Sequence, residues 1–157
     1  MTYVQLVILL ALLEFLLFGL AVGRARTRYK VPAPATSGHE VFERYYRAQM
    51  NTLEQLVVFL PSIWLFAHYI NAWIAVTLGA LFIIGRGLYF RGYVQSAAAR
   101  HAGFTLSAIP NVALLIGALI GVIRAIVLTG GTSGAGVFPR SARAVSWRAR
   151  GPGAASA

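Results

Sequence analysis

Four segments rich in apolar residues follow one another along the chain, separated by short polar connections. They cover residues 3–22, 40–69, 72–93 and 102–128. Each is long enough to cross the hydrocarbon core of a bilayer, which needs roughly 20 residues of helix. Helices also satisfy their own backbone hydrogen bonds where water is absent. The pattern therefore predicts an all-α integral membrane protein, a four-transmembrane-helix bundle formed by residues 1–130.

The first segment has a second interpretation as a cleaved signal peptide, since Ala21, Val22 and Gly23 resemble a cleavage site. A signal peptide usually begins with a positively charged region, and its apolar part is shorter than this one. The N-terminal sequence MTYVQ contains no Lys or Arg. The sequence therefore favours a membrane anchor.

The second segment carries a polar stripe at one end. Its apolar run, residues 56–70, is too short to span a bilayer alone, so the helix must extend back through FERYYRAQMNTLEQ at residues 42–55. Arg47, Asn51 and Glu54 then lie at i, i+4 and i+7, on one helix face. Ionisable groups at membrane depth are costly and usually face a bundle interior or a cavity. The stripe therefore predicts a functional site.

A second polar stripe is predicted at the same end of the bundle. Arg86, Tyr89 and Tyr93 recur at i, i+3 and i+7 in the third segment, and Arg100 follows in the next connection. Because the turn near residues 70–71 is very short, the second and third helices are antiparallel neighbours. Both stripes then reach one leaflet, where they suit a small anionic or zwitterionic ligand. The alternative is an interhelical salt-bridge network in a structural protein.

The composition of the chain limits the ligands and reactions that the predicted site can serve. The chain is 58% hydrophobic and 11% charged, and its net charge of +10 comes from 14 Lys and Arg against four acids. These charges sit at the ends of apolar segments, which suits lipid headgroups or an anionic ligand and not nucleic acid. With no cysteine and three scattered histidines, no metal site is expected. Hydrolase triads, carboxylate pairs and phosphate-binding loops are also missing from the sequence.

Charge also predicts the orientation. The first and third connections contain six basic residues, Arg24, Arg26, Arg28, Lys30, Arg91 and Arg100, whereas the second connection has none. The positive-inside rule places the polar site on the cytoplasmic side and both termini outside. Four arginines in residues 131–157 argue the other way, but this Gly/Ala/Ser/Arg-rich tail is predicted to be disordered and carries little weight.

The sequence FERYYRAQMNTLEQ, followed by GRGLYFRGY and Arg100, resembles the MAPEG family, membrane-associated proteins of eicosanoid and glutathione metabolism. The resemblance covers roughly residues 3 to 128 and is closest to the branch that contains leukotriene-C synthase and bacterial relatives. It implies a homotrimer that binds glutathione between neighbouring subunits, without a metal. The residues implied in that site are Arg26, Arg47, Gln49, Asn51, Glu54, Arg86, Tyr89 and Tyr93.

Arg100 falls where this branch carries the arginine that activates the glutathione sulfur. A guanidinium beside a thiol favours the thiolate, which is the nucleophile. The resemblance thus implies a glutathione transferase or glutathione peroxidase that attacks a hydrophobic electrophile or lipid hydroperoxide from the bilayer. The first alternative is a non-catalytic lipid-binding membrane protein of the same fold that presents ligands to a partner. A small transporter is disfavoured, because four spans without an inverted repeat lack the two halves that move against each other in alternating access.

Two positions depart from the pattern of this branch. Gln55 stands where the synthase has a tyrosine in its glutathione site, and Thr27 stands where it has a second arginine in the first loop. The first change would reshape glutathione binding. The second argues against leukotriene synthesis, so no eicosanoid substrate is assigned by the resemblance.

Overall fold

The computed structural model describes residues 1–96 and 98–130. These residues form four α-helices and one short 3-10 helix: α1 (Thr2–Arg28), α2 (Glu40–Tyr69), α3 (Ala72–Gln95), η1 (Ala98–Arg100) and α4 (His101–Gly130). All four α-helices are long and apolar enough to cross a membrane, and no strand occurs in the described residues. The predicted four-helix membrane fold is thereby confirmed. The predicted disordered tail, residues 131–157, lies outside the described residues.

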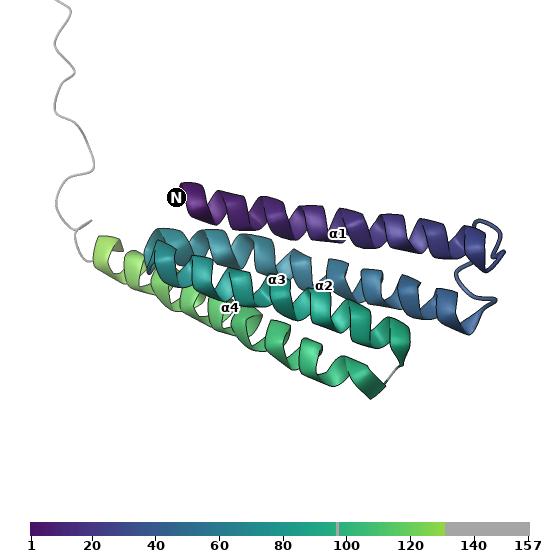
Figure 1. Ribbon diagram of the computed structural model, residues 1–157. Helices are drawn as coiled ribbons and strands as arrows, with labels where there is room; N and C mark the ends of the chain where they lie inside the picture. The colour runs from purple at the N-terminus through teal and green to yellow at the C-terminus, as the bar shows by residue number, and fades with distance from the viewer. Residues whose placement is uncertain (97, 131–157) are drawn as a thin grey trace, which may run out of the picture.

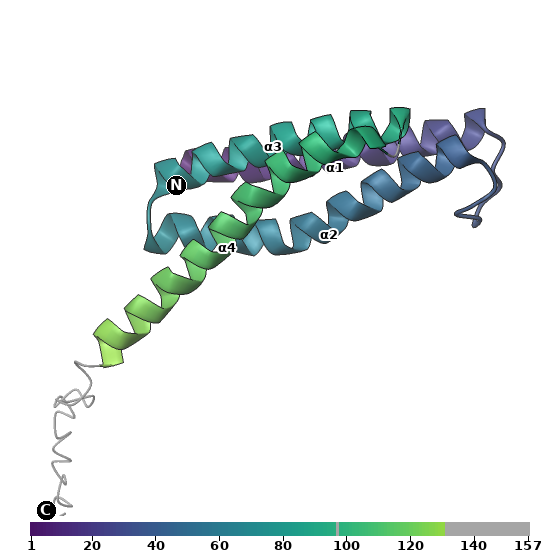
Figure 2. The same cartoon turned by 90° about the horizontal axis from the view of Figure 1, so that it is seen from below.

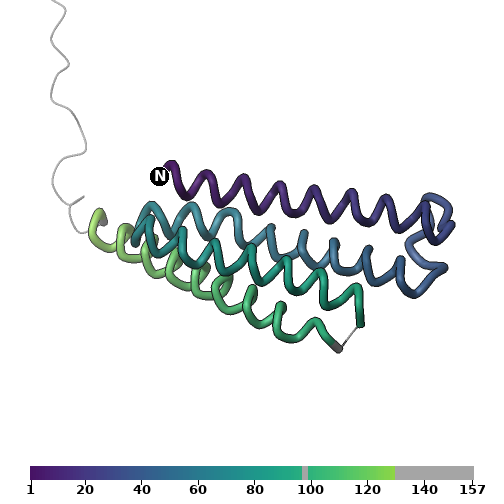
Figure 3. Tube along the Cα trace, in the orientation of Figure 1, coloured from purple at the N-terminus to yellow at the C-terminus, as the bar shows by residue number. Residues whose placement is uncertain are grey.

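The two central helices are α2 and α3, and the outer helices pack against them (Figure 1). In the described residues α1 contacts α2 and α3 but not α4, whereas α4 contacts α2 and α3. Seen from below, α4 crosses α2 obliquely (Figure 2). The α1–α2 loop and the η1 connection lie toward one end of the bundle, and the N-terminus and the α2–α3 turn lie at the other (Figure 3). The two predicted polar stripes are therefore carried toward the same end.

The turn between α2 and α3 is tight because one amide side chain caps the start of α3. Asn71 Oδ1 accepts hydrogen bonds from the backbone N–H groups of Trp73 at 2.8 Å and Ile74 at 3.1 Å. These bonds satisfy donors that a helix N-terminus leaves free. At the other end, α1 continues past Val22 to Arg28, since arginine is a good helix former and its charge suits a helix C-terminus.

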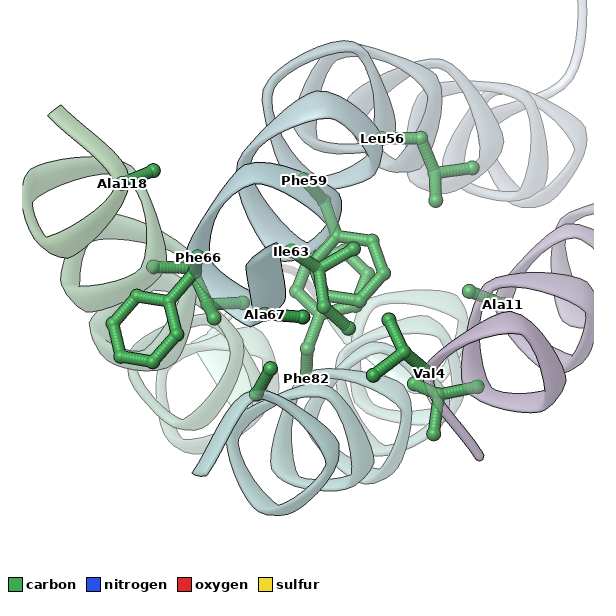
Figure 4. Close-up of a cluster of buried hydrophobic side chains, with 12 residues drawn as sticks. Val4, Ala11, Leu56, Phe59, Ile63, Phe66, Ala67, Phe82 and Ala118 are labelled. Carbon is green, nitrogen blue, oxygen red and sulfur yellow. The ribbon is translucent and has the colours of Figure 1, made fainter. Parts of the chain in front are cut away.

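The core of the bundle is a cluster of aromatic and aliphatic side chains from all four α-helices (Figure 4). Phe59 and Phe82 stack with their ring centroids 4.0 Å apart, and both are fully buried together with Val4 and Ile63. Most leucines of α1 remain on the outside, where a bilayer would cover them. The apolar core thus lies inside the four-helix bundle, while the outward-facing leucines of α1 suit contact with lipid.

Two glycines bring α3 and α4 into backbone contact beside the polar end. A Cβ added at Gly85 would lie 2.6 Å from the backbone nitrogen of Ser107. A Cβ added at Gly103 would lie 2.7 Å from the carbonyl carbon of Leu88 and would meet the backbone of Tyr89 even more closely. Real Cβ atoms do not come this close to backbone atoms, so any other residue would push the helices apart. The position of Tyr89 therefore depends on Gly103.

Candidate functional site

The polar stripes of α2 and α3 meet inside the bundle through a direct side-chain hydrogen bond. Asn51 Nδ2 donates to Tyr89 Oη at 2.5 Å. The Arg86 guanidinium lies over the Tyr89 ring, 4.1 Å from its centroid, and its Nη2 donates to Thr52 Oγ1 at 2.6 Å. Helix α2 therefore holds two of the three residues of the α3 stripe, Tyr89 through Asn51 and Arg86 through Thr52.

Arg86 is fully buried, which is costly for a charged group unless it is compensated. Within the described residues, its Nε and Nη1 atoms have no hydrogen-bond partner. Glu14 of α1 lies beside Gly87 and is close enough to Arg86 to interact with it electrostatically. Arg86 thus packs against the face of the Tyr89 ring, with Thr52 as its hydrogen-bond acceptor and the carboxylates of Glu14 and Glu54 as compensating charges.

We expect Thr52→Val to destabilise the fold by about 1–3 kcal/mol, because it removes the acceptor of a buried charged donor without changing the side-chain volume. The matched control is Thr77→Val in α3, where an exposed hydroxyl bonds only to a carbonyl of its own helix, Trp73 O, at 3.1 Å. Unfolding of both variants in mixed detergent micelles would be compared with the wild type. Equal stability of the two variants would show that Arg86 does not need this acceptor.

A pocket of about 330 Å³ opens beside the Asn51–Tyr89 hydrogen bond. It is lined by Asn51, Tyr89, Arg100, His101 and Phe104. The Arg100 guanidinium lies 5.2 Å from the centroid of the Tyr93 ring, and Tyr93 in turn stacks on Tyr89 at 5.6 Å. A fixed cation, an amide and a phenol therefore surround one small space.

The approach of η1 to α3 places Arg100 in this pocket. A Cβ added at Gly92 would lie 2.5 Å from the carbonyl oxygen of Ala99, so only glycine lets the two segments come so close. Gly92 lies one residue before Tyr93, on the helix that carries the second stripe. The contact thereby places the arginine over a ring of the same stripe.

The structure brings Asn51, Arg86, Tyr89, Tyr93 and Arg100 together, and it places the other predicted site residues elsewhere on the protomer. Arg47 and Glu54 are exposed on the outer face of α2. Gln49 lies against Gly19 of α1, where an added Cβ would be 3.0 Å from its Nε2. Arg26 lies over the Phe42 ring, and its Nη1 donates to backbone carbonyls of the α1–α2 loop, at 2.7 Å to Ala35 O. In the protomer these four residues do not line the pocket.

Sequence reasoning missed two features of this region. His101 and Phe104 line the pocket. The scattered histidines of the sequence predicted only that no metal site forms, and they gave His101 no role. Its position next to Arg100 was the available signal. Asn111 of α4 donates from Nδ2 to Gln55 Oε1 at 2.9 Å, a bond that joins α2 to α4 close to the site. No local spacing connects these two amides, so the sequence offered no signal for the pair.

The chain is similar in sequence to membrane proteins of one known family. The model of the MAPEG family matches residues 4–120. An uncharacterized protein of Synechocystis is 48% identical over 118 residues, which cover 75% of this chain and 86% of that protein. Microsomal glutathione S-transferase 2 of Homo sapiens is 45% identical over 103 residues, covering 65% and 70%. Leukotriene C4 synthase of Cavia porcellus is 39% identical over 102 residues, covering 65% and 68%.

Proposed function

The chain belongs to the MAPEG family, and from this premise we propose that it is a membrane-bound glutathione transferase. In this proposal Arg100 activates the glutathione thiol as a thiolate, which attacks a hydrophobic electrophile. The observation that carries the proposal is the pocket in which Arg100 faces Asn51 and Tyr89. The names of the relatives from Homo sapiens and Cavia porcellus support the choice of glutathione and of transferase chemistry.

The proposed role of Arg100 is electrostatic. A free thiol has a pKa of about 8.5, so only a few per cent of it is thiolate at neutral pH. A guanidinium beside the sulfur favours the anion, and lowering the thiol pKa by about 2 units requires roughly 2.7 kcal/mol. Because arginine stays protonated, it stabilises the thiolate and does not act as a base.

Binding of the glutathione backbone would use the polar side chains around the pocket. Asn51, Tyr89 and Tyr93 offer an amide and two phenols as hydrogen-bonding groups, and Arg86 braces Tyr89 from below. The glutathione carboxylates are suited to arginine, which recognises carboxylates through paired hydrogen bonds. Arg47 would bind one of them, and Glu54 would bind the ammonium group.

The exposure of Arg47 and Glu54 supports a homotrimer as the functional unit. Both side chains face outward from α2 in the protomer, at a depth where contact with lipid would be costly. A neighbouring subunit would cover them and enclose the ligand from the other side. In this arrangement Arg26 and Gln49 of the neighbour would complete the glutathione site, with Arg26 holding a carboxylate.

The site is proposed to face the cytoplasm in a bacterial inner membrane. Exposed basic residues gather at the polar end of the bundle, at Arg24, Arg28, Lys30 and Arg91. At the opposite end, Arg124 is the one Lys or Arg among the described residues. Basic residues are enriched on the cytoplasmic side of membrane proteins. Glutathione would therefore enter from the cytosol, and a hydrophobic acceptor would reach the same pocket through the bilayer.

A glutathione titration of the detergent-purified protein tests the proposal. We expect a saturable rise in ultraviolet thiolate absorbance, and no rise with S-methylglutathione, which lacks the thiol. Light scattering on the same sample should give three subunit masses. Binding of glutathione without a thiolate signal would refute activation of the thiol.

A non-catalytic lipid-binding protein of the same fold is the second candidate. An apolar groove of about 400 Å³ between α2 and α4 favours it, lined among others by Val58, Leu65, Leu115 and Leu119. Such a groove suits an acyl chain without requiring any reaction. If the titration detected no glutathione binding, this candidate would replace the transferase.

A further inference from the structure

His101 is a pocket residue to which the proposed transferase chemistry gives no role. It is the first residue of α4, directly after Arg100, and it lines the pocket together with Asn51, Tyr89 and Phe104. Its side chain is exposed, and within the described residues no hydrogen bond from its imidazole ring is found. The ring is therefore available to a molecule that enters the pocket.

Among the pocket-lining residues, His101 carries the side-chain type that most often acts as a proton donor in enzymes. Arg100 keeps its proton, and the amide of Asn51 has none to give. Tyr89 is a weak acid whose oxygen already accepts a hydrogen bond from Asn51. Imidazole gains and loses a proton near physiological pH, and for that reason it is the commonest general acid and base in enzymes.

A proton donor matters only for some acceptors. When thiolate displaces chloride from an aryl chloride, the leaving group departs as a stable anion and requires no proton. When thiolate attacks a peroxide, the leaving group is an alkoxide, a strong base that departs far more readily as an alcohol. An imidazolium beside the thiolate would therefore accelerate the second reaction and leave the first nearly unchanged.

We propose that His101 is a catalytic general acid for the reduction of organic hydroperoxides, an inference that rests on the proposed glutathione activation by Arg100. The thiolate sulfur attacks the terminal peroxide oxygen, so that an S–O bond forms and the O–O bond breaks. The departing alkoxide takes the imidazolium proton and leaves as the alcohol. Sulfur is oxidised by two electrons to the sulfenic acid of glutathione, and the peroxide is reduced by two.

A second glutathione closes the cycle. Its thiol condenses with the sulfenic acid to give oxidised glutathione and water, and the imidazole regains its proton from the solvent. The two glutathiones and the hydroperoxide are the reactants needed. Phe104 supports a hydrophobic hydroperoxide, because its ring lines the same pocket and is half exposed on the outside of α4, where lipid would lie.

The inference is tested by assaying His101→Gln with two acceptors, cumene hydroperoxide and 1-chloro-2,4-dinitrobenzene. We expect peroxide turnover to fall about tenfold or more, within the range typical of general acid catalysis. The rate with the aryl chloride and the thiolate absorbance should stay within about twofold of wild type, since the thiolate is made by Arg100. The selective loss distinguishes proton donation from a general disturbance of the pocket, which would slow both reactions.

The control is His68→Gln, which changes an exposed histidine near the C-terminal end of α2, at the opposite end of the bundle. It should leave both reactions unchanged. Equal losses with the two acceptors, or no loss with the peroxide, would overturn the role of His101 while the transferase stands. If wild-type protein gave no thiolate signal with glutathione, the proposed function itself would fail, and this inference with it.

Discussion

Arg100→Ala is expected to lower transferase turnover about 25-fold at neutral pH while glutathione still binds. The factor follows because lowering a thiol pKa from about 8.5 to about 6.5 raises the thiolate fraction at pH 7 from about 3% to about 75%, and the variant loses this gain. Binding should persist because the hydrogen-bonding groups of Asn51 and Tyr89 remain in place. The measurements are kcat with 1-chloro-2,4-dinitrobenzene, the thiolate absorbance of the complex, and the Kd for glutathione.

The control for this variant is Arg91→Ala, which removes an exposed arginine in the last turns of α3 at the same end of the bundle. It changes the net charge by the same amount and should leave turnover within about twofold, because an exposed charge is largely screened by solvent and salt. If Arg100→Ala reduced glutathione affinity as strongly as turnover, the arginine would hold the ligand and would not act on its sulfur.

Gly103→Ala is expected to have the largest effect on the fold. The added methyl group would collide with the backbone of Leu88 and Tyr89, and backbone atoms cannot turn aside as a flexible side chain can. Overpacking of this kind costs about 1–3 kcal/mol or more, so the temperature of thermal unfolding in detergent should fall clearly. Glutathione binding should weaken too, because the displaced segment carries the Tyr89 hydroxyl.

Gly23→Ala provides the matched control for this prediction. Gly23 lies in α1, and a Cβ added there meets nothing within 4 Å. Since alanine is the better helix former, this variant should be as stable as wild type or more stable, by up to about 1 kcal/mol. Equal unfolding temperatures for the Gly103 variant and the wild type would show that α3 and α4 can separate without cost.

The sequence predicted the four helices because apolar segments of membrane length have few alternative structures. It also predicted that the stripe of Arg47, Asn51 and Glu54 shares one face, since helical spacing decides that. It could not predict that Asn51 reaches Tyr89 while Arg47 and Glu54 point outward. Burial depends on which neighbouring helix covers which part of the face, and helix crossing angles are not encoded in the spacing of one helix.

The same limit applies to residues whose partners lie far along the chain. The bond between Gln55 and Asn111 joins α2 to α4, and the two amides lie 56 positions apart, with no spacing that connects them. Likewise, the position of Arg100 depends on the close approach of Gly92 to Ala99, a backbone contact that leaves no periodic mark. Homotrimer assembly, and the roles of Arg26 and Gln49 in it, remain predictions of the family resemblance.

The peripheral position of α1 has a consequence for how the protein is made. This helix packs on α2 and α3, which both follow it in the chain, so it leaves the ribosome before these partners have been synthesised. An acid at the middle of a membrane helix raises the cost of insertion by about 2.5–3.5 kcal/mol, while each leucine lowers it by about 0.3–0.6 kcal/mol. The many leucines around Glu14 therefore allow α1 to insert alone. Glu14 gains its electrostatic partner, Arg86, only after α3 has been inserted.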